Sequence, residues 1–291
     1  MIKDFEYFAP KTVNEALSLL SRYKDECKMI AGGQSLLILM RQRLVALDYL
    51  IDIKGISSLD YINFDENYGL SIGALTPHRT IEESPLVRKR FGVLAEMETK
   101  VASVQTRNSG TIGGNLCHND PAGDPTPVLI ALNGKLKLTS PRGERTIAME
   151  DFVTDYFETV LEPDEILTEI QVPNLPPHTG TVYHKFTKRE GDMAIVGIAV
   201  SITLNLKNGI CKDARIVLGA IASVATRAKS AESVLVGKEI DNELLEEAAR
   251  LASEEATPTS DIHASEEYRR ELVKVLVKRI GWEALARAKA A

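Results

Sequence analysis

The chain has 291 residues, 44% of them hydrophobic and 26% charged, which is the composition of a folded protein with enough apolar material for a large core. This length predicts two or three domains. The formal net charge of −6 provides no basic field that would recruit a phosphate backbone, so the composition argues against a nucleic-acid partner.

Membrane, export and metal signals are weak. The most apolar segment, residues 193–206, is shorter than the roughly 20 residues that a membrane-spanning helix needs, and its β-branched residues favour a strand. Residues 1–20 have neither the basic start nor the unbroken apolar run of a secretory signal, so we expect a cytoplasmic protein. The cysteines Cys27, Cys117 and Cys211 show no C-x-x-C spacing, which argues against a disulfide framework and against a metal site in this chain.

Helix and strand signals alternate in the first part of the chain. Thr12 and Glu15 form a capping-box pattern that predicts a helix over about residues 13–23. The stretch "KMIAGG" predicts a buried strand that runs into a Gly-Gly turn, and "SLLILMRQRL" predicts the helix or helical turn that follows. "YLIDIKGI" and "LSIGALT" predict further short strands.

A second helix signal leads to a second glycine loop. Ser84 followed by Pro85 predicts a helix start, and "LVRKRFGVLAEMETKVA" has apolar residues at helical spacing up to the loop "SGTIGGNLCHND". Beyond this loop, Asn133-Gly134 in "PVLIALNGKLKLTS" predicts a tight turn. "DEILTEIQVP" predicts a strand that ends at Pro173.

The proline-rich stretch "VPNLPPHTG" predicts a linker, and we place a domain boundary near residue 177. After it, strands are predicted at about residues 182–187, 193–206 and 211–220, followed by two helices capped by Asp241 and Ser265. Strands first and helices last predict an antiparallel sheet with helices on one face, which is an α+β domain.

Both glycine loops have the composition of an anion site. A residue without Cβ allows positive φ and close approach of a ligand, and successive N–H groups at a bend or helix start attract an anion. Ser35 can add a hydroxyl to the first loop, and Thr111 and Asn115 flank the glycines of the second. Taken singly, each loop is more often turn geometry than a ligand site. Neither completes a triphosphate-binding loop or G-x-G-x-x-G, so the pair predicts a diphosphate held by neutral backbone donors from two sides.

Together with these loops, five further segments resemble the FAD-binding medium subunit of the molybdenum hydroxylases, the family of xanthine dehydrogenase and aerobic carbon monoxide dehydrogenase. The segments are "FEYFAPKTVNEALSLL", "IGALTPHRTIE", "EPDEILTEIQVP", "YHKFTKREGDMAIV" and "GAIASVATRAKSAESVLVGK". The resemblance implies an α+β fold: a vanillyl-alcohol-oxidase/PCMH-type FAD-binding domain of two α/β subdomains, about residues 1–57 and 58–177, and a C-terminal α+β domain over residues 178–291.

The resemblance also implies which residues bind FAD. The two loops would enclose the diphosphate, Asp124 would make a polar contact with the dinucleotide, and Leu167 and Lys185 would line the flavin. Val101 matches a wall position that is aromatic in some relatives, and Met193 matches a tyrosine that covers the flavin in the carbon monoxide enzyme. The implied cofactor-binding residues are Met29, Ile30, Ala31, Gly32, Gly33, Gln34, Ser35, Leu36, Val101, Thr111, Ile112, Gly113, Gly114, Asn115, Asp124, Leu167 and Lys185. None is implied to be catalytic or to bind a metal.

Structural alternatives stay open at several of these positions. Asp124 lies among prolines and glycines and can be a turn former. Lys185 can be a solvated strand lysine. The adjacent Cys117 and His118 have neither metal-ligand spacing nor a third member to orient a base, so we expect a structural histidine there, as at His78 and His184.

By the resemblance, the chain passes electrons from an iron–sulfur subunit to an external acceptor. The small partner would carry two 2Fe–2S clusters, the large partner would carry molybdopterin, and the complex would be a dimer of heterotrimers. Two alternatives remain: a self-contained FAD-dependent reductase or oxidase of the same fold, and a non-catalytic scaffold subunit.

Overall fold

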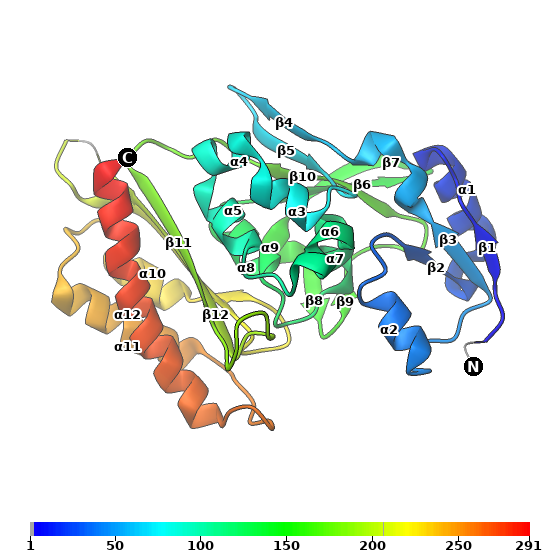
Figure 1. Ribbon diagram of the computed structural model, residues 1–291. Coiled ribbons are helices and arrows are strands. Elements are labelled where there is room, and N and C mark those ends of the chain that lie inside the picture. Colours follow the sequence, from blue (N-terminus) through cyan, green and yellow to red (C-terminus); the bar gives the residue numbers. More distant parts are fainter. Residues whose placement is uncertain (1–2, 206) are drawn as a thin grey trace.

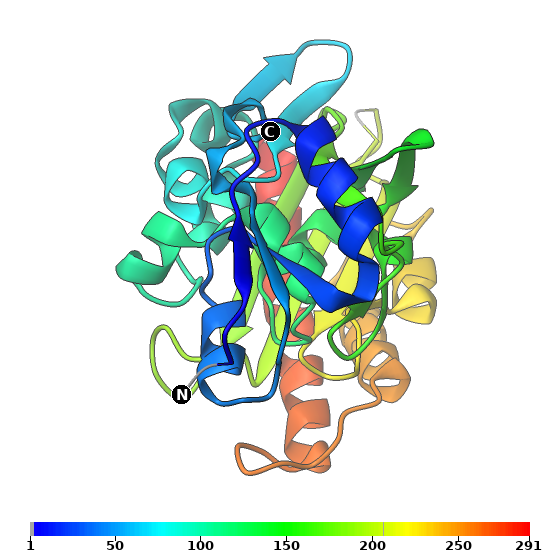
Figure 2. The same cartoon turned by 90° about the vertical axis from the view of Figure 1, so that its right-hand side faces the viewer.

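The computed structural model describes residues 3–205 and 207–291, which form three larger sheets that follow one another along the chain, with helices packed around them (Figure 1). The N-terminal and C-terminal sheets lie at opposite ends of the molecule, with the middle sheet between them (Figure 1). The view from the side shows the N-terminal strands in front and the C-terminal helices behind (Figure 2). Residues 1 and 2, and residue 206 at the end of the strand predicted over residues 193–206, lie outside the described part of the chain.

The N-terminal sheet is parallel, with strand order β1-β3-β2. Helix α1 starts where predicted, because Thr12 Oγ1 accepts a hydrogen bond from the Glu15 N–H at 3.2 Å, and the Glu15 carboxylate accepts one from the Lys11 N–H at 2.7 Å. The first Gly-Gly turn joins β2 to α2, as predicted. The elements are β1 (Glu6–Phe8), α1 (Val13–Tyr23), η1 (Lys24–Glu26), β2 (Cys27–Ile30), α2 (Leu36–Arg41), β3 (Tyr49–Asp52), η2 (Ile53–Gly55) and η3 (Ser57–Leu59).

The middle sheet is antiparallel, with strand order β4-β5-β10-β6-β7. Its apolar side chains and those of the surrounding helices form one buried cluster that includes Phe91 and Phe152. The strand predicted to end at Pro173 is β10, and it does end at Val172. The elements are β4 (Ile62–Asp65), β5 (Gly69–Gly73), α3 (His78–Glu83), α4 (Pro85–Arg90), α5 (Gly92–Glu98), α6 (Val104–Ser109), α7 (Ile112–His118), α8 (Pro125–Ala131), β6 (Lys135–Ser140), β7 (Gly143–Ala148), α9 (Met149–Phe152), β8 (Val153–Asp155), β9 (Glu158–Thr159) and β10 (Ile166–Val172).

The single helix predicted before the second glycine loop was wrong. The start at Ser84 and Pro85 is correct, and Ser84 accepts a hydrogen bond from the Val87 N–H. The chain then leaves the helix at Phe91, which has φ −136° and ψ 51°, and α5 and α6 follow as separate helices. Phe91 turns into the core, where its ring packs against Phe64. Burial of this ring stabilises the chain by more than continuation of the helix would, so the helix ends there. The tight turn predicted at Asn133-Gly134 is present between α8 and β6, where Asn133 has φ 57° and the Gly134 N–H donates to Leu129 O at 2.7 Å.

The C-terminal part is an antiparallel sheet of order β11-β12-β13-β14, with α10, α11 and α12 covering one face (Figure 1). Both predicted caps are correct: Asp241 accepts from the Leu244 N–H, and Ser265 accepts from the Tyr268 N–H. None of the helices in the described ranges combines the length and the apolar composition needed to cross a membrane. The elements are β11 (Thr179–Phe186), β12 (Val196–Leu204), β13 (Cys211–Gly219), β14 (Thr226–Arg227), α10 (Lys229–Leu235), α11 (Asn242–Glu255) and α12 (Glu266–Ala290).

The opposite face of the C-terminal sheet packs on the middle part of the chain. Helix α8 contacts β12 and β13, and Ala199 and Val217 of these strands belong to the same buried cluster as the middle sheet. Asp124 precedes α8 directly, so this packing carries its carboxylate to β11. Residues on both sides of the predicted linker therefore meet in one polar cluster, which is described below.

Candidate cofactor-binding site

The two glycine loops are in contact. A Cβ placed on Gly32 would lie 2.2 Å from the Ser109 carbonyl oxygen and 2.6 Å from Gly110 Cα, so only glycine fits there. Gly114, in the first turn of α7, faces the first loop, since its Cβ would lie 3.7 Å from Ala31 Cβ. The fold thus brings together two bends that are far apart in sequence, as the sequence predicted, and both present small residues to the space between them.

The first loop offers backbone donors. Gly33 has φ 71°, a left-handed conformation that glycine adopts without strain. In the described part of the chain, the N–H groups of Gly32, Gly33, Gln34 and Ser35 donate to no protein acceptor. A bend with successive unused N–H groups attracts an anion. Residues 29–36 contain no carboxylate that would oppose one.

The second loop differs from the expectation. The Ile112 N–H donates to Thr76 O at 3.1 Å and the Gly113 N–H donates to Ala74 O at 2.9 Å, because residues 74–78 run alongside the loop. The Gly114 N–H is taken by Thr111 Oγ1 at 3.1 Å, so Thr111 acts as the N-cap of α7. The predicted unpaired N–H groups are therefore committed within the protein. This loop contributes an open surface at Gly114, with the Asn115 side chain beside it, rather than a second row of donors.

Asp124 and Lys185 form a buried ion pair. Lys185 Nζ donates to Asp124 Oδ2 at 2.8 Å and to Lys100 O at 3.0 Å, while the Tyr183 hydroxyl donates to Asp124 Oδ1 at 2.6 Å. Both charged side chains are only 5% exposed. This exposure excludes the solvated-lysine alternative. Asp124 stands at the N-cap position of α8 but makes no capping bond, so it is not a turn former held by its own backbone.

Burial sets the proton affinity of this cluster. It raises the pKa of Asp124, although Lys185 and Tyr183 lower it. Burial, followed by the Asp124 charge, raises the pKa of Tyr183 well above its ordinary value, so the phenol stays a donor. The hydrogen bond from Lys185 Nζ to Lys100 O places this cluster next to Val101, which follows Lys100 in the chain. Asp124, Lys185 and the segment at Val101 are thus neighbours in the fold.

The apolar members of the predicted set lie in the core. Val101, Ile112 and Leu167 belong to one buried cluster. Ile30 faces a separate cluster beneath α2, and Met29 packs on the other side of β2 against the α1 layer. The side chains of these five residues therefore pack within the apolar clusters of the fold.

The sequence reasoning missed a second buried pair. His78 Nδ1 lies 2.7 Å from Glu98 Oε2, and a Cβ on Gly110 would lie 3.3 Å from His78 Cδ2. Burial lowers the pKa of His78, but the Glu98 carboxylate outweighs it and raises the pKa overall. The motif "IGALTPHRTIE" contains His78, and its partner Glu98 lies on a different helix.

Cys117 and His118 are not a reactive pair. Burial raises the pKa of the Cys117 thiol to about 12, so no thiolate forms near neutral pH. Burial lowers the pKa of His118, whose ring lies 5.1 Å from that of Phe157. Within residues 3–205 and 207–291, no group of three or more His, Cys, Asp or Glu side chains is placed to hold a metal ion.

A bend with unused backbone donors and no carboxylate within residues 29–36, together with a glycine-opened partner loop, defines a site for a diphosphate-containing dinucleotide cofactor. The family described as "FAD binding domain in molybdopterin dehydrogenase" matches residues 3–175, and "CO dehydrogenase flavoprotein C-terminal domain" matches residues 181–284. The chain therefore belongs to the family of FAD-binding subunits of molybdopterin dehydrogenases, and FAD is its cofactor.

Relatives and solved structures are consistent with this family. The chain is 37% identical over 281 residues to the nicotine 6-hydroxylase medium subunit of Paenarthrobacter nicotinovorans, covering 97% of each chain. It superposes on carbon monoxide dehydrogenase from Hydrogenophaga pseudoflava with TM-score 0.95 and 36% identity, covering 99% of each chain. Quinoline 2-oxidoreductase from Pseudomonas putida 86 matches with TM-score 0.92 and 33% identity over 99% of each chain. These matches confirm the predicted fold class.

Proposed function

We propose that this chain is the FAD-carrying electron-transfer subunit of a molybdenum hydroxylase, which takes electrons from an iron–sulfur partner and passes them to an external acceptor. The observation that carries the proposal is the contact between the two glycine loops, the first of which offers unused backbone N–H groups from Gly32 to Ser35. Bound FAD would supply the redox chemistry, since a flavin exchanges electrons singly or in pairs.

In this proposal the chain's own residues bind and orient the cofactor. The N–H groups of Gly32–Ser35 hold the diphosphate, Ala31 and Gly114 leave it room, and the Asp124–Lys185 pair borders the site from the C-terminal sheet. The remaining predicted contacts, including Val101 and Leu167, form the walls. We also propose that the chain divides near residue 177 into the FAD-binding domain, with subdomains of about residues 1–57 and 58–177, and the C-terminal domain.

The state of the titratable side chains favours electron transfer over a self-contained oxidase. In the described part of the chain, three ion pairs around the loops are buried: His78 with Glu98, Asp124 with Lys185, and Arg107 with Glu82. A general acid or base needs a proton it can exchange with a substrate. Because these groups are paired and buried, they are suited to stabilising the fold around the site rather than to exchanging protons with a substrate.

The proposed partners are a small subunit with two 2Fe–2S clusters and a large subunit with molybdopterin, assembled with this chain as a dimer of heterotrimers. The names of the relatives support this, because they are medium subunits or members of dehydrogenase complexes. We place the complex in the cytoplasm. All three cysteines lie in the described ranges and are free thiols, as is usual in a reducing compartment.

Purification of the tagged chain from its own host tests the proposal. We expect a yellow protein that copurifies with two other chains, whose metal content shows iron and molybdenum, and whose mass in solution fits two copies of each chain. A yellow protein that turns over alone would support the self-contained enzyme instead. A colourless protein would support the scaffold, and cell fractionation tests the compartment.

A further inference from the structure

Helix α6 ends against the first glycine loop. A Cβ on Gly32 would lie 2.2 Å from the carbonyl oxygen of Ser109, the last residue of α6. A Cβ on Gly110, the residue after α6, would lie 3.4 Å from Gln34 Cγ. Gly32 and Gln34 carry two of the backbone N–H groups that donate to no protein acceptor within the described ranges. The position of α6 therefore sets how closely the second loop approaches the donors of the first.

Helix α6 begins just after a strained turn, residues 100–102. Ala102 has φ 40°, a left-handed conformation that strains a residue with a Cβ. Such a conformation persists only where neighbouring groups hold it. The first carbonyl of the turn, Lys100 O, accepts from Lys185 Nζ at 3.0 Å, so the turn is joined to the buried ion pair on β11.

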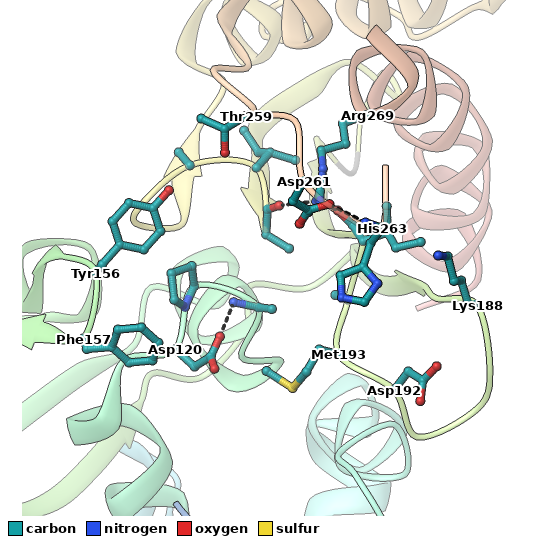
Figure 3. A pocket seen from close by; sticks show the side chains of 17 residues that line it. Asp120, Tyr156, Phe157, Lys188, Asp192, Met193, Thr259, Asp261, His263 and Arg269 are labelled. Carbon is teal, nitrogen blue, oxygen red and sulfur yellow. Dashed lines mark hydrogen bonds and ion pairs between the residues drawn. The ribbon is translucent and has the colours of Figure 1, made fainter. Parts of the chain in front are cut away.

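The same turn supports a loop on its other side. Residues 187–195 join β11 to β12, and a Cβ on Gly191 in this loop would lie 3.3 Å from Ala102 O. Figure 3 shows Asp192 and Met193 of this loop at a cavity of about 530 Å³. The turn is thus packed between α6 and the β11–β12 loop, so a shift of the turn would displace both.

Arg107 fixes α6 and the turn to each other. It lies on α6 and is only 7% exposed. Its Nε donates to Glu82 Oε2 on α3 at 2.8 Å, and its Nη1 donates to Val101 O at 2.9 Å and to Ala102 O at 3.3 Å. One planar guanidinium therefore joins α6 both to α3 and to two consecutive carbonyls of the turn. A lysine ammonium is a point charge that lacks this fork of donors.

Glu82 has a second arginine partner. Arg79 Nη1 donates to Glu82 Oε1 at 2.8 Å, while Arg107 binds the other carboxylate oxygen. Removal of Arg107 would therefore leave the buried carboxylate paired, so such a variant is expected to fold. The carbonyls of Val101 and Ala102 would lose this donor, and the loss would fall on the turn and on α6.

We propose that Arg107 is a positioning residue for FAD: it holds α6 and the turn at residues 100–102 in the arrangement that sets the spacing of the two glycine loops. Arg107 acts on the cofactor through α6, whose end at Ser109 meets the first loop. The inference rests on the proposed function, because it uses the placement of the FAD diphosphate between these loops.

Dissociation of FAD from the loaded full chain tests this, with unfolding in urea as the companion measurement. The Kd is obtained from the fluorescence of released flavin on dilution. We expect Arg107→Met to raise the Kd for FAD about tenfold, which corresponds to about 1.4 kcal/mol, as loss of a hydrogen bond from a charged donor would. Arg107→Lys keeps the charge beside Glu82 but not the fork, so we expect a Kd about fivefold above that of the wild type, with a nearly unchanged urea midpoint.

Arg227→Met is the matched control. Arg227 also pairs with a buried carboxylate, since its Nε donates to Glu232 Oε1 at 3.0 Å and its Nη2 donates to Glu232 Oε2 at 2.6 Å. Glu232 keeps the Ile216 N–H as a second donor, just as Glu82 keeps Arg79. The control pair joins β14 to α10 in the C-terminal part of the chain. We expect its loss to lower the urea midpoint and to leave the Kd for FAD unchanged.

The outcomes separate this inference from the proposed function. An unchanged Kd in both Arg107 variants overturns the inference. It is equally overturned if Arg227→Met raises the Kd as much as Arg107→Lys does, because loss of FAD would then follow stability alone. A wild-type chain that holds no FAD refutes the proposed function and the inference together. A wild-type chain that holds FAD but copurifies with no other chain refutes the proposed partners only, and a raised Kd in the Arg107 variants would still support the positioning role.

Discussion

His78 and Glu98 form a buried ion pair directly behind the second glycine loop, with Nδ1 2.7 Å from Oε2 and the imidazole packed against Gly110. The His78 N–H also donates to Gly110 O at 3.0 Å. The other carboxylate oxygen of Glu98 is buried and has no hydrogen-bond partner in the described part of the chain. The imidazole of His78 therefore compensates the negative charge of Glu98. The backbone N–H of His78 also fixes the second glycine loop, through its hydrogen bond to Gly110 O.

Removal of His78 alone should be costly. His78→Leu leaves Glu98 buried without its charged partner, and we expect the free energy of unfolding at neutral pH to fall by about 3 kcal/mol. The double variant His78→Leu/Glu98→Met should recover most of this loss, because two apolar groups need no partner. Urea unfolding of the two single variants and the double variant measures the coupling. A double variant as unstable as the sum of the singles would show that the pair does not interact.

The same pair predicts a pH dependence of stability. Burial lowers the pKa of His78, but the Glu98 carboxylate outweighs burial and raises this pKa above its ordinary value of 6.5. Two smaller effects oppose each other: Asp124 raises the pKa and Arg107 lowers it. The folded chain then binds this proton more tightly than the unfolded chain does. Its contribution is complete below the unfolded pKa and is lost as the pH rises through the folded pKa. We expect the melting temperature of the wild type to fall as the pH rises above about 6, and that of His78→Leu/Glu98→Met to lack this part of the fall. Identical pH profiles of the two proteins would contradict the prediction.

Local signals in the sequence predicted the element ends well. Thr12, Ser84 with Pro85, Asp241 and Ser265 all cap helices as expected, because a cap depends on three or four neighbouring residues. The break at Phe91 was missed because it depends on a ring of a distant strand.

The buried ion pairs could not be predicted from the sequence, for a related reason. Glu98 meets His78 only when α5 packs on α3, and Lys185 meets Asp124 only when β11 and the start of α8 come together. Likewise, the Gly113 N–H is committed to Ala74, which lies in a different segment. The glycine pattern predicted an anion site, but which N–H groups remain free depends on residues 74–78, which run alongside the second loop.

The first glycine loop should be intolerant of side chains for a reason specific to the cofactor. Gly33→Val places a β-branched residue at φ 71° and a bulky group beside the unused N–H groups, so we expect loss of FAD from the purified chain. Gly209→Val is the matched control, since Gly209 has φ 70° and open space around it. Both variants carry similar backbone strain, of about 1–2 kcal/mol. Flavin absorbance per chain should fall in the first and stay unchanged in the second, and equal retention in both would refute the placement of the cofactor.

The Asp124–Lys185 pair should act on stability before it acts on electron transfer. Lys185→Met leaves a carboxylate whose pKa is already raised by burial, with the Tyr183 hydroxyl as its remaining partner. We expect about 3 kcal/mol of destabilisation, with partial recovery in Lys185→Met/Asp124→Asn, because the amide carries no charge. The loss should appear in the unfolding of the middle and C-terminal parts together, since the pair joins α8 to β11. Urea unfolding measures the stability, and stopped-flow reoxidation of the flavin measures the electron transfer. An unchanged unfolding midpoint in Lys185→Met, with slower reoxidation, would show that the lysine serves the flavin and not the joint between the two sheets.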